Sequence, residues 1–275
     1  MSVKFVSDFL LEDSTGGAER VDNTVITALG LEAVRSRDFT PNKEDFYIIS
    51  NISLLPQDKI DYLADNCNYI ILEHDYKFHH TRHPWRYPNN VVPTNELINL
   101  SLYENAITTF VQTDDHLEVF KLNNIKGNFE SLNCSIWSKE ELKLLESLHR
   151  SNPKKKSKFA ILDSSNWIKN TKQAREFCES MKIDYDVVGN EDYAEFLGSL
   201  AQYSALVFFP IARETCCRLL VEAKCLGLNV ITSNNSGAFN SDWFDRSGAE
   251  MTGYLEHMSL TNLDKIEGIL HEHKL

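Results

Sequence analysis

Short apolar runs alternate with amphipathic segments along most of the chain. The apolar runs predict β-strands at residues 3–7, 46–50, 69–72 and 108–113, and then at 159–162, 185–188, 205–210 and 230–232. Helical spacing of apolar residues predicts helices at 21–29, 58–65, 101–105, 171–181, 191–202, 215–225 and 262–273. Strands that alternate with helices in this way are typical of α/β domains built on parallel sheets.

A polar segment at residues 151–158 interrupts the alternation. It contains a proline and four lysines, and a new apolar strand follows it. We therefore expect two Rossmann-like, doubly wound domains, an N-terminal one at 1–150 and a C-terminal one at 151–275. Two such domains imply a central cleft, lined by the carboxyl ends of strands and the N-termini of helices.

Composition narrows the class of protein. The 275 residues are 42% hydrophobic and 25% charged, as in ordinary soluble proteins, and the net charge is -12. Such acidity argues against general nucleic-acid binding, which needs clustered Lys and Arg. The six cysteines lack paired metal-ligand spacing, which predicts reduced thiols in a cytoplasmic protein. No apolar run approaches the ~18 residues of a transmembrane helix, and the start reads as a strand and not as a signal peptide.

Two glutamates offer the most specific chemistry. Glu214 and Glu222 lie eight positions apart, and the strand at 229–232 follows after Gly227. With Glu214 at a helix start and Glu222 inside the helix, the pair could hold the two ends of an elongated ligand. The helix start would offer backbone N–H groups to an anion between them. A nucleotide-sugar has that layout, although surface carboxylates on a helix are the plainer alternative.

The order of motifs resembles the retaining glycosyltransferases of the GT-B fold, family 4 in particular. Glu214 and Glu222 look like that family's Glu–seven residues–Glu motif. Gly16-Gly17-Ala-Glu-Arg20 looks like its N-terminal Gly-Gly loop, and Lys169 takes the place of its phosphate-binding lysine. The segment 232–238 resembles its small-residue loop. The chain departs from the family at Asp163, where an Arg is usual, and the segment after Glu214 lacks the usual glycines.

The resemblance implies a donor site in the C-terminal domain. Glu214 would accept hydrogen bonds from the donor sugar, Glu222 would bind the ribose, and Lys169 would stabilise the leaving diphosphate. Arg213 or Arg218 would supply the missing arginine charge, although either could instead form a surface ion pair. The backbone N–H groups of Thr215, Cys216 and Cys217 would contact the diphosphate. In the N-terminal domain, Gly16 and Gly17 lack a Cβ and would let the backbone approach the sugar or the phosphate.

A second cluster follows the strand at 69–72. The resemblance points to His74 as the family's cleft histidine, which touches the donor sugar near the reacting carbon, and Asp75 would orient it or contact the acceptor. The basic and aromatic segment after them predicts an acceptor-binding loop, with a structural loop as the alternative. We expect acceptor contacts from Arg20, Lys77, His80, Arg82 and Trp85. No carboxylate or cysteine pattern accompanies the histidines, so we expect no metal site.

These expectations combine into one hypothesis of function. The chain would transfer a sugar, with retention, from a nucleotide diphosphate sugar such as a UDP-sugar to an acceptor hydroxyl, without a metal cofactor. The acceptor would be a glycan, a lipid-linked sugar or a hydroxymethylated DNA base. A non-catalytic nucleotide-sugar binding module and a GT-B nucleotide-sugar epimerase are the alternatives. The sequence does not define the oligomeric state.

Overall fold

The chain folds into two compact units. The computed structural model describes residues 2–151, 154–189 and 192–273. Unit 1 comprises Met1–Trp137 and Met258–Leu275, and unit 2 comprises Ser138–His257. The expected boundary at residue 150 differs from this division because helix α5 (Lys139–Ser151) packs on α7 (Tyr193–Leu200) and α8 (Arg218–Cys225) of unit 2. The last helix, α9 (Gly248–Glu272), carries the chain back into unit 1.

Unit 1 is built on a six-stranded parallel sheet in the order β2-β1-β3-β4-β5-β6. Its strands are β1 (Val3–Ser7), β2 (Glu32–Arg35), β3 (Phe46–Ile49), β4 (Asn68–Leu72), β5 (Thr109–Val111) and β6 (Phe129–Ser131). Every residue of β3 is buried, because helices cover both faces of a parallel sheet.

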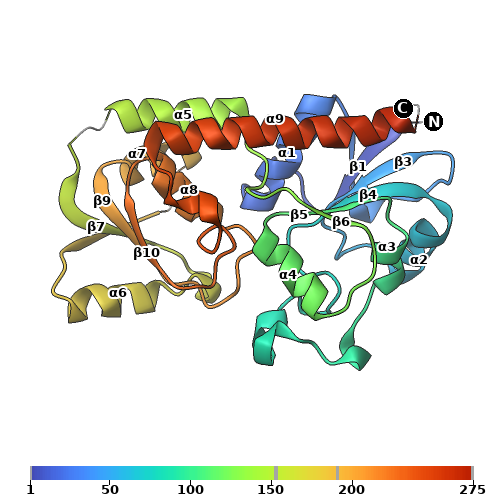
Figure 1. The fold of residues 1–275 in the computed structure, drawn as a ribbon, viewed down its shortest axis with the longest axis horizontal. Helices are drawn as coiled ribbons and strands as arrows, with labels where there is room; N and C mark the ends of the chain where they lie inside the picture. The colour runs from blue at the N-terminus through green and yellow to red at the C-terminus, as the bar shows by residue number, and fades with distance from the viewer. Residues whose placement is uncertain (1, 152–153, 190–191, 274–275) are drawn as a thin grey trace. The chain divides into compact units, whose positions relative to one another are not determined.

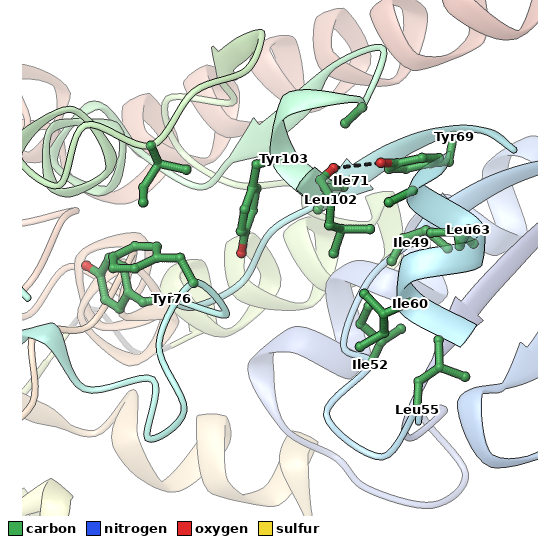
Figure 2. Close-up of a cluster of buried hydrophobic side chains, with 14 of the residues drawn as sticks. Ile49, Ile52, Leu55, Ile60, Leu63, Tyr69, Ile71, Tyr76, Leu102 and Tyr103 are labelled. Atoms are coloured by element: carbon green, nitrogen blue, oxygen red, sulfur yellow. Dashed lines mark hydrogen bonds between the residues drawn. The ribbon is translucent and has the colours of Figure 1, made fainter. Parts of the chain in front are cut away.

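Alternate residues of these strands enter two different cores. Phe46 and Ile48 belong to a core that also contains residues of α1 (Gly17–Leu29) and of the end of α9. Both helices lie on the same side of the sheet (Figure 1). Tyr47 and Ile49 belong to the opposite core, which also contains residues of α2 (Gln57–Asn66), α3 (Leu100–Glu104) and α4 (Asp114–Leu122). Figure 2 shows this second core, where the Tyr69 hydroxyl donates to the Leu102 carbonyl at 2.7 Å.

Unit 2 repeats the arrangement on a smaller scale. Its parallel sheet has the order β10-β9-β7-β8. The strands are β7 (Lys156–Leu162), β8 (Tyr185–Val188), β9 (Tyr203–Phe208) and β10 (Asn229–Thr232). Helix α6 (Thr171–Ser180) packs Ala174 and Cys178 on one face of this sheet, and α7 and α8 lie on the opposite face (Figure 1).

The expected α/β architecture is confirmed, with corrections to individual elements. The two edge strands of unit 1, β2 and β6, were not expected because they are short and contain no fully buried residue. Helices α4 and α5 were also missed, and α9 begins 14 residues before the expected start at 262. Residues 152–153 of the expected linker and residue 191 of an expected helix lie outside the described residues, while 156–158 of that linker are part of β7.

No helix within the described residues is long and apolar enough to cross a membrane.

Candidate functional site

Each sheet has a point where the chain changes its direction of winding. In unit 1 it lies between β1 and β3, and in unit 2 between β7 and β9. In open parallel sheets, ligands bind beyond the carboxyl ends of the strands at this point. His74 follows β4, next to β3, while Lys169 and Glu214 follow β7 and β9. Lys169 and Glu214 therefore follow the two strands at the switch point of unit 2, while His74 follows the strand next to the switch point of unit 1.

Lys169 and Glu214 form a direct ion pair in unit 2. Lys169 ends the short 3-10 turn after β7, and its Nζ donates to Glu214 Oε1 at 2.7 Å. The two side chains remain 32% and 20% exposed, so solvent or a ligand can reach them. Burial opposes the lysine charge, but the adjacent Glu214 carboxylate still raises the pKa of Lys169 above its ordinary value. The ammonium is thus charged at neutral pH and available to an anion.

The segment from Glu214 to Cys217 is not helical, contrary to the expected helix start. The N–H of Glu214 donates to the Asn235 carbonyl and its carbonyl accepts from Gly237, both within the loop after β10. Cys217 has a left-handed backbone (φ 70°), and α8 begins only at Arg218. Pairing with the 235–237 loop holds the segment extended, so Glu214 lies before the helix and Glu222 inside it.

Glu222 belongs to a buried polar network. Its side chain is 6% exposed, and its Oε1 accepts from the Tyr193 hydroxyl at 2.8 Å. Arg218 lies 3.9 Å from the same oxygen through Nε, and its Nη2 donates to Glu141 of α5 at 2.9 Å. Arg218, expected at the donor diphosphate, is therefore engaged inside unit 2. Tyr193 and Glu141 were missed because they lie far from Glu222 in the sequence.

The other expected donor residues of unit 2 lie in the segment before α8. Arg213 and Thr215 are partly buried, and Cys216 and Cys217 are buried. Burial raises the pKa of the Cys216 thiol to about 12 and that of Cys217 well above its usual range, so both stay protonated. All six cysteines are free thiols.

Two buried hydroxyls also occur in unit 2, at the end of β10. The Oγ atoms of Thr232 and Ser233 have no hydrogen-bond partner among the described residues. In the sequence, these two residues drew attention only because the segment 232–238 resembles the small-residue loop of the glycosyltransferase family.

In unit 1 the Gly-Gly loop forms the start of α1. Gly16 is the N-cap and Gly17 the first helical residue, so the helix begins four residues before the expected position. A side chain at Gly16 would collide with the Glu19 carboxylate, which folds back over the helix start. Burial raises the pKa of Glu19. Arg20 is partly buried in the first turn, and its N–H donates to the Gly16 carbonyl.

His74 contacts a residue that the sequence did not single out. Its Nε2 lies 2.7 Å from Oδ1 of Asp22, on the buried side of α1. Asp22 also accepts from the hydroxyls of Ser7 at 3.0 Å and Ser50 at 2.7 Å. Ser7 ends β1 and Ser50 follows β3, so three strand ends meet at one carboxylate. The only signal in the sequence was an acid on the apolar face of a predicted helix.

Lys77, expected to bind the acceptor, lies inside unit 1. It is 4% exposed and donates to Glu73, which is fully buried and also accepts from the Tyr103 hydroxyl at 2.6 Å. Asp75 accepts from Arg82 at 2.8 Å. Burial raises the pKa of the Asp75 carboxyl, although Lys77 and Arg82 oppose the shift. The cluster fixes the backbone on either side of His74.

A second buried histidine locks the same turn. His116 of α4 accepts from the Gln112 N–H through Nδ1 at 3.1 Å, so its Nε2 carries the proton and donates to the Asp75 carbonyl at 2.6 Å. Burial lowers the pKa of His116 to about 3. The imidazole is therefore neutral and acts as a fixed hydrogen-bond bridge between α4 and the His74 turn.

The basic and aromatic loop contains both exposed and engaged residues. His80 is exposed, Arg82 is 40% exposed, and Trp85 is partly buried beside His83 and under the Arg86 guanidinium. Within the described residues, no group of three or more His, Cys, Asp or Glu side chains is arranged to hold a metal ion.

No protein-family model and no curated protein matches the chain. Solved structures do resemble it. Sucrose-phosphate synthase from Thermosynechococcus elongatus matches with a TM-score of 0.52 and 10% identity, over 83% of this chain and 73% of that one. Anabaena HepE in complex with UDP matches with a TM-score of 0.51 and 10% identity, over 96% and 91%.

A third solved structure is similar over almost the whole chain. It is an alpha-glucosyltransferase in complex with UDP and a 13-mer DNA containing a HMU base, with a TM-score of 0.50 and 9% identity, over 97% of this chain and 90% of that one. Identities this low establish the architecture and leave the chemistry open. The two parallel α/β units of this chain have the GT-B fold of these glycosyltransferases.

Proposed function

We propose that this protein is a retaining glycosyltransferase that moves a sugar from a nucleotide diphosphate sugar to an acceptor hydroxyl. The Lys169–Glu214 pair at the switch point of unit 2 carries the proposal. It places a cation and a hydrogen-bond acceptor side by side where ligands bind in parallel sheets. The GT-B fold supports the same class of reaction.

Unit 2 would hold the donor along its length. Glu222 binds the ribose hydroxyls, held in orientation by Tyr193 and Arg218. Lys169 exchanges Glu214 for the diphosphate oxygens, and the released Glu214 carboxylate accepts hydrogen bonds from the sugar. The α8 N-terminus adds favourable dipole charge for the anion.

The reaction itself needs no group on the protein that forms a covalent bond. The bond between the anomeric carbon and the diphosphate oxygen breaks, and the acceptor oxygen bonds to the same face of that carbon. The acceptor proton passes to the leaving phosphate, whose growing charge Lys169 stabilises. Since Lys169 meets this charge, the proposal assigns no role to a metal, and turnover in EDTA should match turnover without it.

The similar structures suggest donors and acceptors to test first. HepE and the alpha-glucosyltransferase were both solved with UDP, which makes UDP-sugars the first donors. The second also holds DNA with a modified base, so DNA containing hydroxymethylated bases belongs in the acceptor panel beside glycans. His80, Arg82 and Trp85 would contact the acceptor, and their mixture of charge and aromatic surface fits either class.

The test begins with thermal shifts over a panel of nucleotides and nucleotide-sugars. Product mass spectrometry then detects transfer, and the NMR coupling of the anomeric proton distinguishes retention from inversion. Stabilisation without turnover would identify a binding module, and donor conversion without acceptor would identify an epimerase. Either result would refute the transferase proposal.

Two variants separate the roles of the glutamates. Glu222→Ala should weaken nucleotide binding by about 10-fold or more, because hydrogen bonds to a charged group contribute about 1.5–3 kcal/mol. Glu214→Ala should leave nucleotide affinity nearly unchanged and abolish most sugar transfer. The exposed Glu250→Ala serves as the matched control in the same unit. Unchanged nucleotide binding in Glu222→Ala, or full transfer by Glu214→Ala, would contradict the assigned role.

A further inference from the structure

The carboxylate of Asp22 lies at the centre of the switch point in unit 1. It is 1% exposed and sits on the inner face of α1, less than two turns after Gly16 and Gly17. Ser7 and Ser50 bring it hydroxyls from the ends of the neighbouring strands β1 and β3. A buried charge at this depth persists only when hydrogen bonds satisfy it.

The contact with the Asp22 carboxylate determines the tautomer of His74. Both carboxylate oxygens of Asp22 accept hydrogen bonds from serine hydroxyls, so the His74 nitrogen that lies 2.7 Å from Oδ1 is the donor and carries the proton. That nitrogen is Nε2. In the neutral imidazole Nδ1 is then the acceptor nitrogen.

The backbone around His74 is fixed independently of Asp22. On one side, fully buried Glu73 accepts from the Asp75 N–H at 3.0 Å and from Lys77. On the other, His116 donates to the Asp75 carbonyl at 2.6 Å. With the backbone held, the hydrogen bond to Asp22 orients the imidazole ring.

We propose that Asp22 is a positioning residue for sugar transfer, whose carboxylate holds the His74 ring in one orientation and in the Nε2–H tautomer. The part that His74 plays in transfer rests on the proposed function. The tautomer and its dependence on Asp22 do not, because they follow from the contacts inside unit 1 alone. Asp22 itself does not touch the substrate; it acts through the ring of His74.

The first test measures the tautomer without any substrate. Nitrogen-15 spectra of the histidine side chains, with the His74 signals identified by their loss in His74→Gln, should show Nε2 protonated in the native chain. In Asp22→Asn, where the amide can also donate, the signals should move toward the Nδ1–H form. Asp65→Asn, an exposed substitution in the same unit, should leave them unchanged. A native chain with Nδ1–H at His74 would overturn the proposal even if Asp22→Asn did not fold.

The second test compares the effect of Asp22→Asn on kcat with its effect on UDP affinity. Asp22→Asn should lower kcat by about 10- to 100-fold, the range seen when other orienting hydrogen bonds are removed. UDP affinity should stay within about 2-fold of native, because unit 2 supplies the expected nucleotide contacts. Native kcat in Asp22→Asn would overturn the positioning role, and an equal loss of kcat and UDP affinity would indicate a merely structural one. A chain that transfers no sugar would refute the proposed function, while the nitrogen spectra would still decide the tautomer.

Discussion

The two units differ in how deeply the charged residues near the switch points of their sheets are buried. Both bring charged residues to the switch point of a parallel sheet. In unit 1, Asp22, Glu73 and Lys77 are each at most 4% exposed and satisfy one another or neighbouring hydroxyls. In unit 2, Lys169 and Glu214 stay partly exposed and form a single ion pair.

This difference separates fixed geometry from exchangeable contacts. A partly exposed ion pair contributes little to stability, so a ligand can replace one partner at small cost. A buried pair cannot be opened so easily, because the group left behind loses both water and its partner. At its switch point, unit 1 is therefore suited to hold one side chain, His74, in place, while the Lys169–Glu214 pair at the switch point of unit 2 is suited to exchange protein contacts for ligand contacts.

The sharpest way to break the comparison is to remove the buried lysine of unit 1. Lys77→Met should lower the free energy of unfolding by about 3–5 kcal/mol, because Glu73 keeps its buried charge without its partner. Urea denaturation followed by far-UV circular dichroism measures the loss. Lys265→Met in the exposed pair with Glu130, also in unit 1, should cost about 0–1 kcal/mol.

A double variant tests the cause. Glu73→Gln together with Lys77→Met removes both charges, and should recover part of the stability lost in Lys77→Met alone. If Lys77→Met kept native stability and instead weakened acceptor binding, Lys77 would have the acceptor role expected from the sequence, and the contrast between the units would collapse.

The exchangeable pair of unit 2 predicts the reverse pattern. Lys169→Ala should change stability by less than about 1 kcal/mol, since the pair is partly exposed. It should lower kcat by about 100- to 1000-fold, as for other groups that stabilise charge developing in a transition state. Steady-state kinetics with saturating donor measures kcat. Lys172→Ala, with a side chain 87% exposed on the following helix, is the control, and an equal effect in both variants would remove Lys169 from the reaction.

The fold could be predicted from the sequence because its central strands are continuous apolar runs. Strand β3, for example, buries all four of its residues, and an apolar run this short is typical of a strand and too short for a helix. The edge strands β2 and β6 escaped prediction because each buries little on either side. The start of α8 was misplaced because tertiary pairing with the 235–237 loop, and not local propensity, sets the conformation of Glu214.

The candidate site was predicted where a local motif marks it. The resemblance marked Lys169 and Glu214 separately, 45 residues apart, and the structure adds that they pair directly. The partners of site residues were not foreseen, because Asp22 is 52 residues from His74 and Tyr193 is 29 from Glu222. No spacing rule connects such residues; only the sheet topology brings them together. Conversely, Lys77 and Arg218 looked like ligand-binding cations until burial revealed their internal partners.

The smallest expected effect is a loss of stability of unit 1 in mild acid. His116 in unit 1 has its pKa lowered by burial from an ordinary 6.5 to about 3. Between these values the unfolded chain binds a proton that the folded chain does not, so stability falls as pH drops below 6.5 and is unaffected above it. From pH 7 to pH 5 His116 should cost unit 1 about 2 kcal/mol, at about 1.4 kcal/mol for each pKa unit.

His116→Gln isolates this contribution, because its amide can donate to the Asp75 carbonyl but does not titrate in this range. Hydrogen exchange followed by mass spectrometry reads the two units separately. Protection in peptides of α4 should fall from pH 7 to pH 5 more in the native chain than in His116→Gln, after correction for intrinsic exchange rates. Peptides of α8 should show no difference between the two proteins. Equal acid sensitivity of α4 in both would mean that His116 takes up its proton in place, and that the turn carrying His74 is less rigid than its hydrogen bonds imply.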